Sequence, residues 1–483
     1  MAASKAGARD LTQGPIGKTL LLFAIPTLAS NILQSLNGSI NAVWVGRFLG
    51  EQALAATANA NIIMFLMFSI VFGFGMASTV VIAQAVGGGD IDAARRAFGS
   101  AVGFCFLLSM VVAAGGWLGS GALLRLLATP AEAFDMAHVY LQVIFVAMPA
   151  TLLSVMMMMG LRGAGDARTP LIFMIVSVGI DIILNPVLIL GLGPVPAMGI
   201  AGSAAATAAA GFISLILLVA RVYRRDLPLR LRGTEMGYLR PAAAQMKVIL
   251  VKGLPMGLQM IVMSASGLVM IGLVNREGLL VTAAYGASQQ LWTYLQMPAM
   301  AMGAAVSAMA AQNIGAGRWD RVGRVTGFGL GYQCLITGTM IALLLLFDRP
   351  LLALFLGSGS PAIEVARHMQ LLASGSFLLF GCTMIFFGAM RANGVVIAPL
   401  LVLIFTLFGV RLTFYHLGYP HLGADALWLS FPVGSSVAVV LAALLYMRGD
   451  WRKAKLIVAP SAEECRETVQ AEAEPAGRIA PAG

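Results

Sequence analysis

Long apolar runs recur along almost the whole chain, and glycines, prolines or clusters of charge separate them. A helix needs about 20 apolar residues to cross the hydrocarbon core of a membrane. The runs therefore predict an all-α membrane protein with twelve transmembrane helices. Their approximate bounds are 18–42, 54–80, 97–119, 136–159, 170–191, 197–220, 247–273, 280–310, 323–347, 365–389, 395–417 and 424–447.

Composition and charge agree with a membrane protein. Hydrophobic residues make up 59% of the 483 residues and charged residues only 11%, whereas a soluble domain carries about 25% charged residues. With the N-terminus placed in the cytoplasm, 25 of the 31 Lys and Arg fall on the cytoplasmic side, as the positive-inside rule requires. The net charge of +10 therefore predicts topology in the cytoplasmic (inner) membrane, with both termini inside, and no nucleic-acid partner.

The chain also contains an internal repeat. Segments 83–99 and 311–327 match at seven of seventeen positions with an offset of 228. Similar offsets relate further pairs: Pro26 and Pro255, Arg162 and Arg391, Pro170 and Pro399, and His138 and His368. Six helices per copy predict two pseudo-symmetric bundles related by an axis along the membrane normal.

This repeat divides the chain into five predicted parts. A cytoplasmic N-terminal segment, 1–17, precedes the first six-helix bundle, 18–220, and a basic cytoplasmic linker, 221–246, leads to the second bundle, 247–447. The remaining residues, 448–483, are polar and predict a disordered cytoplasmic tail. Two such bundles are typical of a transporter that works by alternating access; a membrane scaffold or enzyme without transport is the alternative.

Several stretches carry a family resemblance, among them "GLRGAGDARTPLIF", "ILNPVLILGLGPVPAMGIAGSAAAT" and the paired "AQAVGGGD" and "AQNIGAGRWD". Over roughly residues 14–450 the chain resembles the multidrug and toxic compound extrusion (MATE) family. Its members export organic, often cationic compounds in exchange for protons or sodium ions. The resemblance implies a monomeric multidrug antiporter in the lipid bilayer, with small cationic or amphipathic substrates and no cofactor beyond the coupling ion. A lipid-linked oligosaccharide flippase of the same superfamily, which needs a large cationic cavity, is the alternative.

The sequence departs from the family pattern at its acidic positions. Members typically carry one acidic residue five positions before the Gly that closes the first span, and another just before a Pro of the fifth. Asn41 and Asn185 occupy these places, and Asp181 lies one helical turn before Asn185. The resemblance therefore implies that the carboxylate has moved by one turn within the same bundle.

Asp181 is the acidic residue predicted to lie farthest from either membrane surface. Because burial disfavours the charged form of a carboxyl group, such a group can take up a proton on one side and release it when water reaches it. Gln34, Asn37 and Asn41 share one face of the first helix, and Asn185 shares the face of Asp181. We expect these five residues to form the ion-coupling site, with proton preferred over sodium. Hydrogen bonding that merely holds helices together is the alternative.

Three further features carry expectations. Pro26 and Pro255 remove a backbone hydrogen bond inside the first and seventh spans, so each predicts a helix kink, which either gates transport or belongs to the static packing. Arg411, in the eleventh span, is expected to extend toward the membrane surface or to cap a helix; a role in attracting or repelling substrate charge is the alternative.

The substrate cleft is expected to be lined by amides and an aromatic ring, which can receive an organic cation: Gln259, Gln289, Gln290 and Tyr294. The four histidines show no metal-ligand spacing, and no Ser/His/Asp arrangement is visible. We therefore predict no metal site, no catalytic residues and no enzyme activity.

Overall fold

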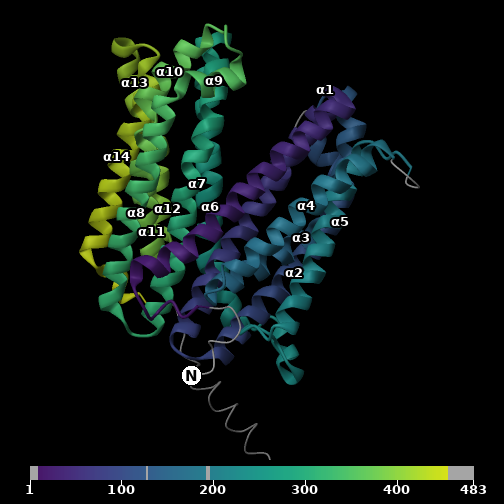
Figure 1. The fold of residues 1–483 in the computed structure, drawn as a ribbon, viewed down its shortest axis with the longest axis vertical. Helices are drawn as coiled ribbons and strands as arrows, with labels where there is room; N and C mark the ends of the chain where they lie inside the picture. Colours follow the sequence, from purple (N-terminus) through teal and green to yellow (C-terminus); the bar gives the residue numbers. More distant parts are fainter. Residues whose placement is uncertain (1–8, 127–128, 192–195, 455–483) are drawn as a thin grey trace, which may run out of the picture.

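The computed structural model describes residues 9–126, 129–191 and 196–454. Two helical bundles approach each other at the end of the molecule where the N-terminus lies and diverge toward the opposite end (Figure 1). We call these the narrow end and the wide end. The predicted all-α fold of twelve transmembrane helices in two bundles is confirmed for the described residues.

The first bundle is built from α1 to α5, and α1 supplies two of its spans. Within α1 (Ile16–Gly87), Gly50 has a φ of 84° and interrupts the helix, a conformation that glycine adopts without steric cost. The two parts are Ile16–Gly50 and Ala60–Gly87. The other helices are α2 (Ile91–Leu126), α3 (Ala131–Gly163), α4 (Arg168–Leu190) and α5 (Ile200–Arg224).

The second bundle contains four uninterrupted helices and two spans that are interrupted. Its uninterrupted helices are α6 (Ala243–Val274), α7 (Leu279–Gly315), α8 (Trp319–Leu346) and α14 (Asp425–Arg448). The tenth span consists of α10 (Ala362–Ala373) and α11 (Ser376–Arg391), which meet at a bend of 41°. The eleventh contains a π-helical turn, η4 (Phe405–Val410), between α12 (Ile397–Ile404) and α13 (Arg411–Leu422).

Four short elements complete the described chain. The helix α9 (Asp348–Leu356), which the sequence did not predict, lies at the wide end (Figure 1). Three short 3-10 helices are η2 (Gly233–Leu239), η3 (Asn275–Glu277) and η5 (Asp450–Lys453).

Hydropathy identifies most of these helices as membrane spans. In the described residues, ten helices are long and apolar enough to cross a bilayer, and the bent pair α10 and α11 adds an eleventh. The twelfth, α7, is 37 residues long and carries several glutamines. The helix α7 packs against both bundles. Trp292 lies in the core of the second bundle, while Met302 and Val306 pack against the first part of α1.

The linker between the bundles is a folded segment. The helix α5 ends at Arg224 and α6 begins at Ala243, inside the predicted linker bounds. Arg95 on α2 forms an ion pair with Glu235 at 2.7 Å, and the Tyr238 hydroxyl donates a hydrogen bond to Asp92 at 2.9 Å. The linker is therefore fixed to the first bundle.

The two copies of the repeated motif meet at the narrow end. A Cβ atom on Gly87 would overlap the backbone oxygen of Gln312, and one on Gly315 would overlap the backbone oxygen of Gln84. Each glutamine side chain also crosses to the other bundle: Gln84 Nε2 donates to the Ala392 oxygen at 2.6 Å, and Gln312 Nε2 donates to the Gly163 oxygen at 2.9 Å. The internal repeat thus becomes a reciprocal contact between the bundles.

A short N-terminal segment, residues 9–14, spans this contact. The Arg9 amide donates to the Gly165 oxygen in the first bundle at 3.2 Å. The Leu11 amide donates to Gln312 Oε1 in the second bundle at 3.1 Å, and the Leu11 side chain is fully buried. Residues 1–8 of the predicted segment 1–17, and 455–483 of the predicted tail 448–483, lie outside the described residues.

Candidate functional site

A buried carboxylate lies inside the first bundle. Asp181 on α4 is 3% exposed. Its Oδ1 accepts hydrogen bonds from the Thr207 hydroxyl on α5 at 3.1 Å and from the Asn185 amide at 3.4 Å. The Asn37 side chain on α1 lies beside this carboxylate. Three helices therefore position one titratable group.

Asn41 extends the same group of polar side chains. Its Oδ1 accepts a hydrogen bond from the Ser203 hydroxyl at 2.8 Å, and the Tyr140 side chain on α3 lies beside it. We call the whole group the Asp181 cluster: Asn37, Asn41, Tyr140, Asp181, Asn185, Ser203 and Thr207. Four of the five predicted ion-coupling residues are members, and Gln34 is not; their role in coupling remains a prediction.

The Asp181 cluster contains oxygen atoms but no positive charge. Among the ion pairs of the described residues, none includes Asp181. The Oδ1 atoms of Asn37 and Asn185 are buried without a hydrogen-bond partner. A buried carboxylate without a counter-charge is costly, so the cluster favours uptake of a proton or of a hard cation that oxygen atoms can ligate.

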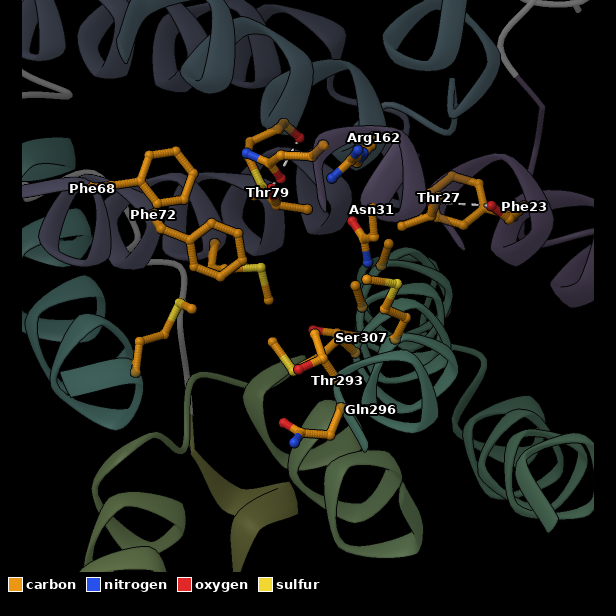
Figure 2. Close-up of a pocket in the computed structure, with 18 residues that line it drawn as sticks. Phe23, Thr27, Asn31, Phe68, Phe72, Thr79, Arg162, Thr293, Gln296 and Ser307 are labelled. Atoms are coloured by element: carbon orange, nitrogen blue, oxygen red, sulfur yellow. Dashed lines mark hydrogen bonds between the residues drawn. The ribbon is translucent and has the colours of Figure 1, made fainter. Parts of the chain in front are cut away.

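A second site, the central cleft, lies between the bundles. It consists of three adjoining cavities, and Phe72 on α1 lines all of them. The largest cavity has a volume of about 270 Å³ and is lined by α1, α3, α6 and α7. Its walls combine aromatic rings and methionines with hydroxyl and amide groups (Figure 2), as is typical of small-molecule sites.

Two of the predicted cleft or coupling residues line this cleft. Gln34 lines the first and third cavities. Gln259 lines the second, and its Nε2 donates to the Val396 oxygen at 3.3 Å.

The other predicted cleft residues lie elsewhere on α7. Gln289, Gln290 and Tyr294 are absent from the linings of the three cavities, and Thr293 and Gln296 line the first cavity instead. The helix is the predicted one. Each helical residue turns by about 100°, so Tyr294 is offset from Thr293, whereas Gln289 shares the side of Thr293 and lies one turn nearer the start of α7.

Sequence reasoning also missed two arginines of the central cleft. Arg162 lines the first and third cavities and Arg391 the second, and no other charged residue lines them. Figure 2 shows Arg162 extending into the cavity near Asn31. Both were assigned to cytoplasmic loops, but they belong to the last turns of α3 and α11. The available signal was their relation by the internal repeat.

The two predicted kink residues lie inside continuous helices. Pro26 is within α1 and Pro255 within α6. Hydroxyl groups bond to backbone oxygens around Pro26: Thr27 donates to Phe23 at 3.1 Å and Ser30 to Pro26 at 2.9 Å. Neither bond reaches the backbone oxygen of Leu22, the acceptor that loses its amide donor because Pro26 has no N–H. A gating role of either proline stays a prediction.

The expectation for Arg411 was wrong. It does not extend to a membrane surface, because it is 7% exposed and its guanidinium lies 3.9 Å from the centre of the Phe431 ring. Nη1 contacts the Ser266 hydroxyl at 3.4 Å, while Nε and Nη2 are buried without a partner. The apolar surroundings of its helix gave no signal for a buried cation.

The comparisons with known proteins identify the family. The MatE family profile matches residues 26–187 and 255–415, one stretch in each bundle. The chain belongs to the MATE family of transporters. Among its relatives, the probable multidrug resistance protein YoeA of Bacillus subtilis is 34% identical over 443 residues, covering 91% of this chain and 95% of that protein.

Two further proteins are similar to this chain over most of its length. An FAD transporter of Shewanella oneidensis is 25% identical over 423 residues, covering 88% of this MATE chain and 92% of the relative. A solved structure, the outward-facing conformation of a multidrug resistance MATE family transporter, has a TM-score of 0.85 and 19% identity, and covers 94% of this chain and 100% of that one. The latter likeness supports the fold alone.

Proposed function

We propose that this MATE protein exports small organic molecules across the cytoplasmic membrane in exchange for an inward-moving cation. The observation that carries the proposal is Asp181, a membrane-buried carboxylate surrounded by hydrogen-bond donors and oxygen atoms but without a counter-charge in the described residues. Burial makes its ionised form costly. The Asp181 cluster is therefore suited to bind a cation on one side and to release it on the other.

Alternating access supplies the coupling. The reciprocal contact of the repeated motifs closes the narrow end, and we propose that this end faces the cytoplasm, with both chain termini on that side. Rocking of the bundles breaks this contact and opens the central cleft to the cytoplasm. Both sites contain residues of α1, since Asn37 belongs to the Asp181 cluster and Gln34 to the cleft. A movement of α1 links them.

We propose proton as the coupling ion. A single carboxylate that gains and loses a proton suffices for proton exchange, whereas sodium requires several oxygen ligands at once. One observation favours sodium as the second candidate. The two buried amide oxygens of Asn37 and Asn185 lack partners, and with Asp181 they form a set of hard ligands.

Small organic substrates fit the dimensions of the central cleft. A volume of about 270 Å³ lies just below the roughly 300–1,000 Å³ of sites for drug-sized ligands and favours export of small compounds over flipping of a lipid-linked oligosaccharide. The names of the relatives support this class, since they include multidrug resistance proteins and an FAD transporter.

Substitution of the carboxylate tests the mechanism. Asp181→Asn keeps the size of the side chain but removes its ionisation, so we expect it to abolish gradient-driven efflux while the protein still folds and inserts. Efflux is measured in proteoliposomes under a proton gradient alone and under a sodium gradient alone. Thr207→Val removes one hydrogen bond worth about 1 kcal/mol and is expected to slow efflux about fivefold.

The matched control is Asp320→Asn, since Asp320 lies in an exposed ion pair with Arg324 near the narrow end. It is expected to transport like the unmodified protein. Full efflux by Asp181→Asn would exclude the carboxylate from coupling. Efflux driven by sodium and not by protons would replace proton with sodium as the coupling ion.

A further inference from the structure

The charge of the central cleft is entirely positive. Arg162 and Arg391 are the charged residues among the linings of its three cavities, and no Asp or Glu is present there. The carboxylate of the Asp181 cluster is not among the lining residues either. A cleft that held an organic cation by ion pairing would be expected to offer a carboxylate to the positive group.

Within the described part of the chain, neither arginine of the cleft forms an ion pair. The Nε atoms of Arg162 and Arg391 are buried without a hydrogen-bond partner there. Each guanidinium has five N–H donors in a planar fork that matches carboxylate and phosphate groups. Two such forks therefore remain available to a ligand.

The internal repeat relates these arginines to each other. Arg162 ends α3 in the first bundle and Arg391 ends α11 in the second, with an offset of 229 residues. Favourable interaction with the carbonyl end of a helix explains a basic residue in a last turn, but that interaction does not require the side chain to extend into a cavity. Figure 2 shows Arg162 directed toward the centre of the first cavity.

The remaining walls define the rest of the ligand. Phe68, Phe72 and Met76 provide an apolar side, while Asn31, Thr79 and Ser307 provide hydroxyl and amide groups. Such a lining fits a molecule with an aromatic or apolar body and one anionic group.

We propose that the central cleft binds amphipathic organic anions, molecules that carry a carboxylate, sulfonate or phosphate on an apolar or aromatic body, and that Arg162 and Arg391 hold the anionic group. This inference rests on the proposed export function and names its substrate class. It departs from the organic cations that the family resemblance implied.

An equilibrium binding experiment tests the substrate class without any ion gradient. Fluorescein and rhodamine 123 share a tricyclic aromatic body of similar size, but at alkaline pH the first is an anion and the second a cation. Binding of each dye to the purified full-length protein is measured by fluorescence anisotropy. We expect fluorescein to bind more tightly by about tenfold or more, as befits charge-assisted hydrogen bonds.

Variants connect the binding to the two arginines. Arg162→Gln and Arg391→Gln are each expected to weaken fluorescein binding by about tenfold, while Arg162→Lys, which keeps the charge, retains more of the affinity. Arg324→Gln removes an exposed arginine outside the cleft and is expected to bind like the unmodified protein. Because Arg162→Lys keeps the positive charge, binding that this variant retains would show that Arg162→Gln weakens binding through loss of charge and not through misfolding.

Several outcomes would overturn the proposal. These are rhodamine 123 binding as tightly as fluorescein, no detectable fluorescein binding, or equal fluorescein affinity in the glutamine variants and the unmodified protein. A repeat in nanodiscs distinguishes a soluble anion from a lipid headgroup: loss of binding in phosphatidylglycerol but not in phosphatidylcholine would assign the arginines to lipid. Because no gradient is involved, each result is independent of whether Asp181 couples transport.

Discussion

Asp181 and Arg411 hold matching places in the two bundles but carry opposite charges. Asn37, which lies beside Asp181, is related by an offset of 229 to Ser266, which contacts Arg411. The pair itself has an offset of 230, and the π turn η4 just before Arg411 accounts for the additional residue, because a π turn takes more residues than an α turn. One ancestral scaffold thus presents a carboxylate in one bundle and a guanidinium in the other.

The unpaired charge of Arg411 makes a prediction about stability. Arg411→Met removes a buried charge that has no acidic partner in the described residues and keeps an apolar side chain of similar length. Replacing buried charge by well-packed apolar groups is often neutral or stabilising by about 1–4 kcal/mol. We therefore expect the Tm of the purified protein to stay the same or to rise, as measured by thermal unfolding in detergent.

The comparison variant is Arg411→Ala, which removes the side-chain volume as well. Its Cγ fills the space beside Gly434, so the alanine variant leaves a cavity and is expected to unfold at a lower temperature. If Arg411→Met lost as much stability as Arg411→Ala, the interactions with Phe431 and Ser266 would outweigh the cost of the buried charge.

Residue-level prediction succeeded where helical spacing alone decided the outcome. Asn37 and Asn41 lie one turn apart on the first helix, as do Asp181 and Asn185, and the structure brings these four together. It failed for Arg411 and for the arginines of the cleft, because the direction of a long side chain at the end of a helix depends on neighbouring helices that lie far away in the sequence.

At the scale of elements, the narrow end depends on close contact between α1 and α7. Gly87 and Gly315 have no space for a Cβ atom against the opposite backbone, and Met302 and Val306 of α7 pack on Leu20 and Phe23 of α1. If the two bundles move apart at the narrow end, α1 and α7 must therefore separate from each other along this whole contact.

Gly87→Ala is predicted to open the narrow end. Its methyl group would collide with the backbone of Gln312, which is not the mobile end of a side chain, so the closed arrangement loses stability relative to the open one. Ser307→Cys in a background without other cysteines reports the opening, because Ser307 lines the cleft and is 1% exposed. We expect a membrane-impermeant maleimide, added on the side of the narrow end, to label it about tenfold faster, which is about 1.4 kcal/mol.

Gly327→Ala is the matched control, since a Cβ atom there meets no atom within 4 Å. It is expected to leave the labelling rate unchanged. Equal rates for Gly87→Ala and the control would show that the glycine contact does not hold the narrow end closed.

The sequence predicted the elements far better than their interruptions. Apolar runs of about 20 residues identified the spans because only a helix satisfies its own backbone groups in lipid. The bend of 41° between α10 and α11 and the π turn η4 had no such signal. They depend on packing between helices, and nothing in the local pattern distinguishes a straight span from a bent one.

At the scale of the whole molecule, the proposed mechanism separates cation and substrate. The Asp181 cluster lies within one bundle and the central cleft lies between the two, so in this mechanism cation and substrate do not compete for one group. Coupling would then require that the bundles rock only when the Asp181 cluster and the cleft are each in the charge state that allows the movement. The charge of the substrate then determines how much charge each transport cycle moves across the membrane.

That charge gives a prediction for the dependence of transport on membrane potential. Exchange of one inward proton for one outward monoanion moves two positive charge equivalents inward, and each contributes about 2.3 kcal/mol per 100 mV. For fluorescein as a dianion the number rises to three, whereas exchange of one proton for the cation rhodamine 123 moves none. An inside-negative potential set by potassium and valinomycin, without a pH gradient, is therefore expected to drive fluorescein out of proteoliposomes. The same potential acting equally on both dyes, or on neither, would contradict one-for-one exchange of a proton with an organic anion.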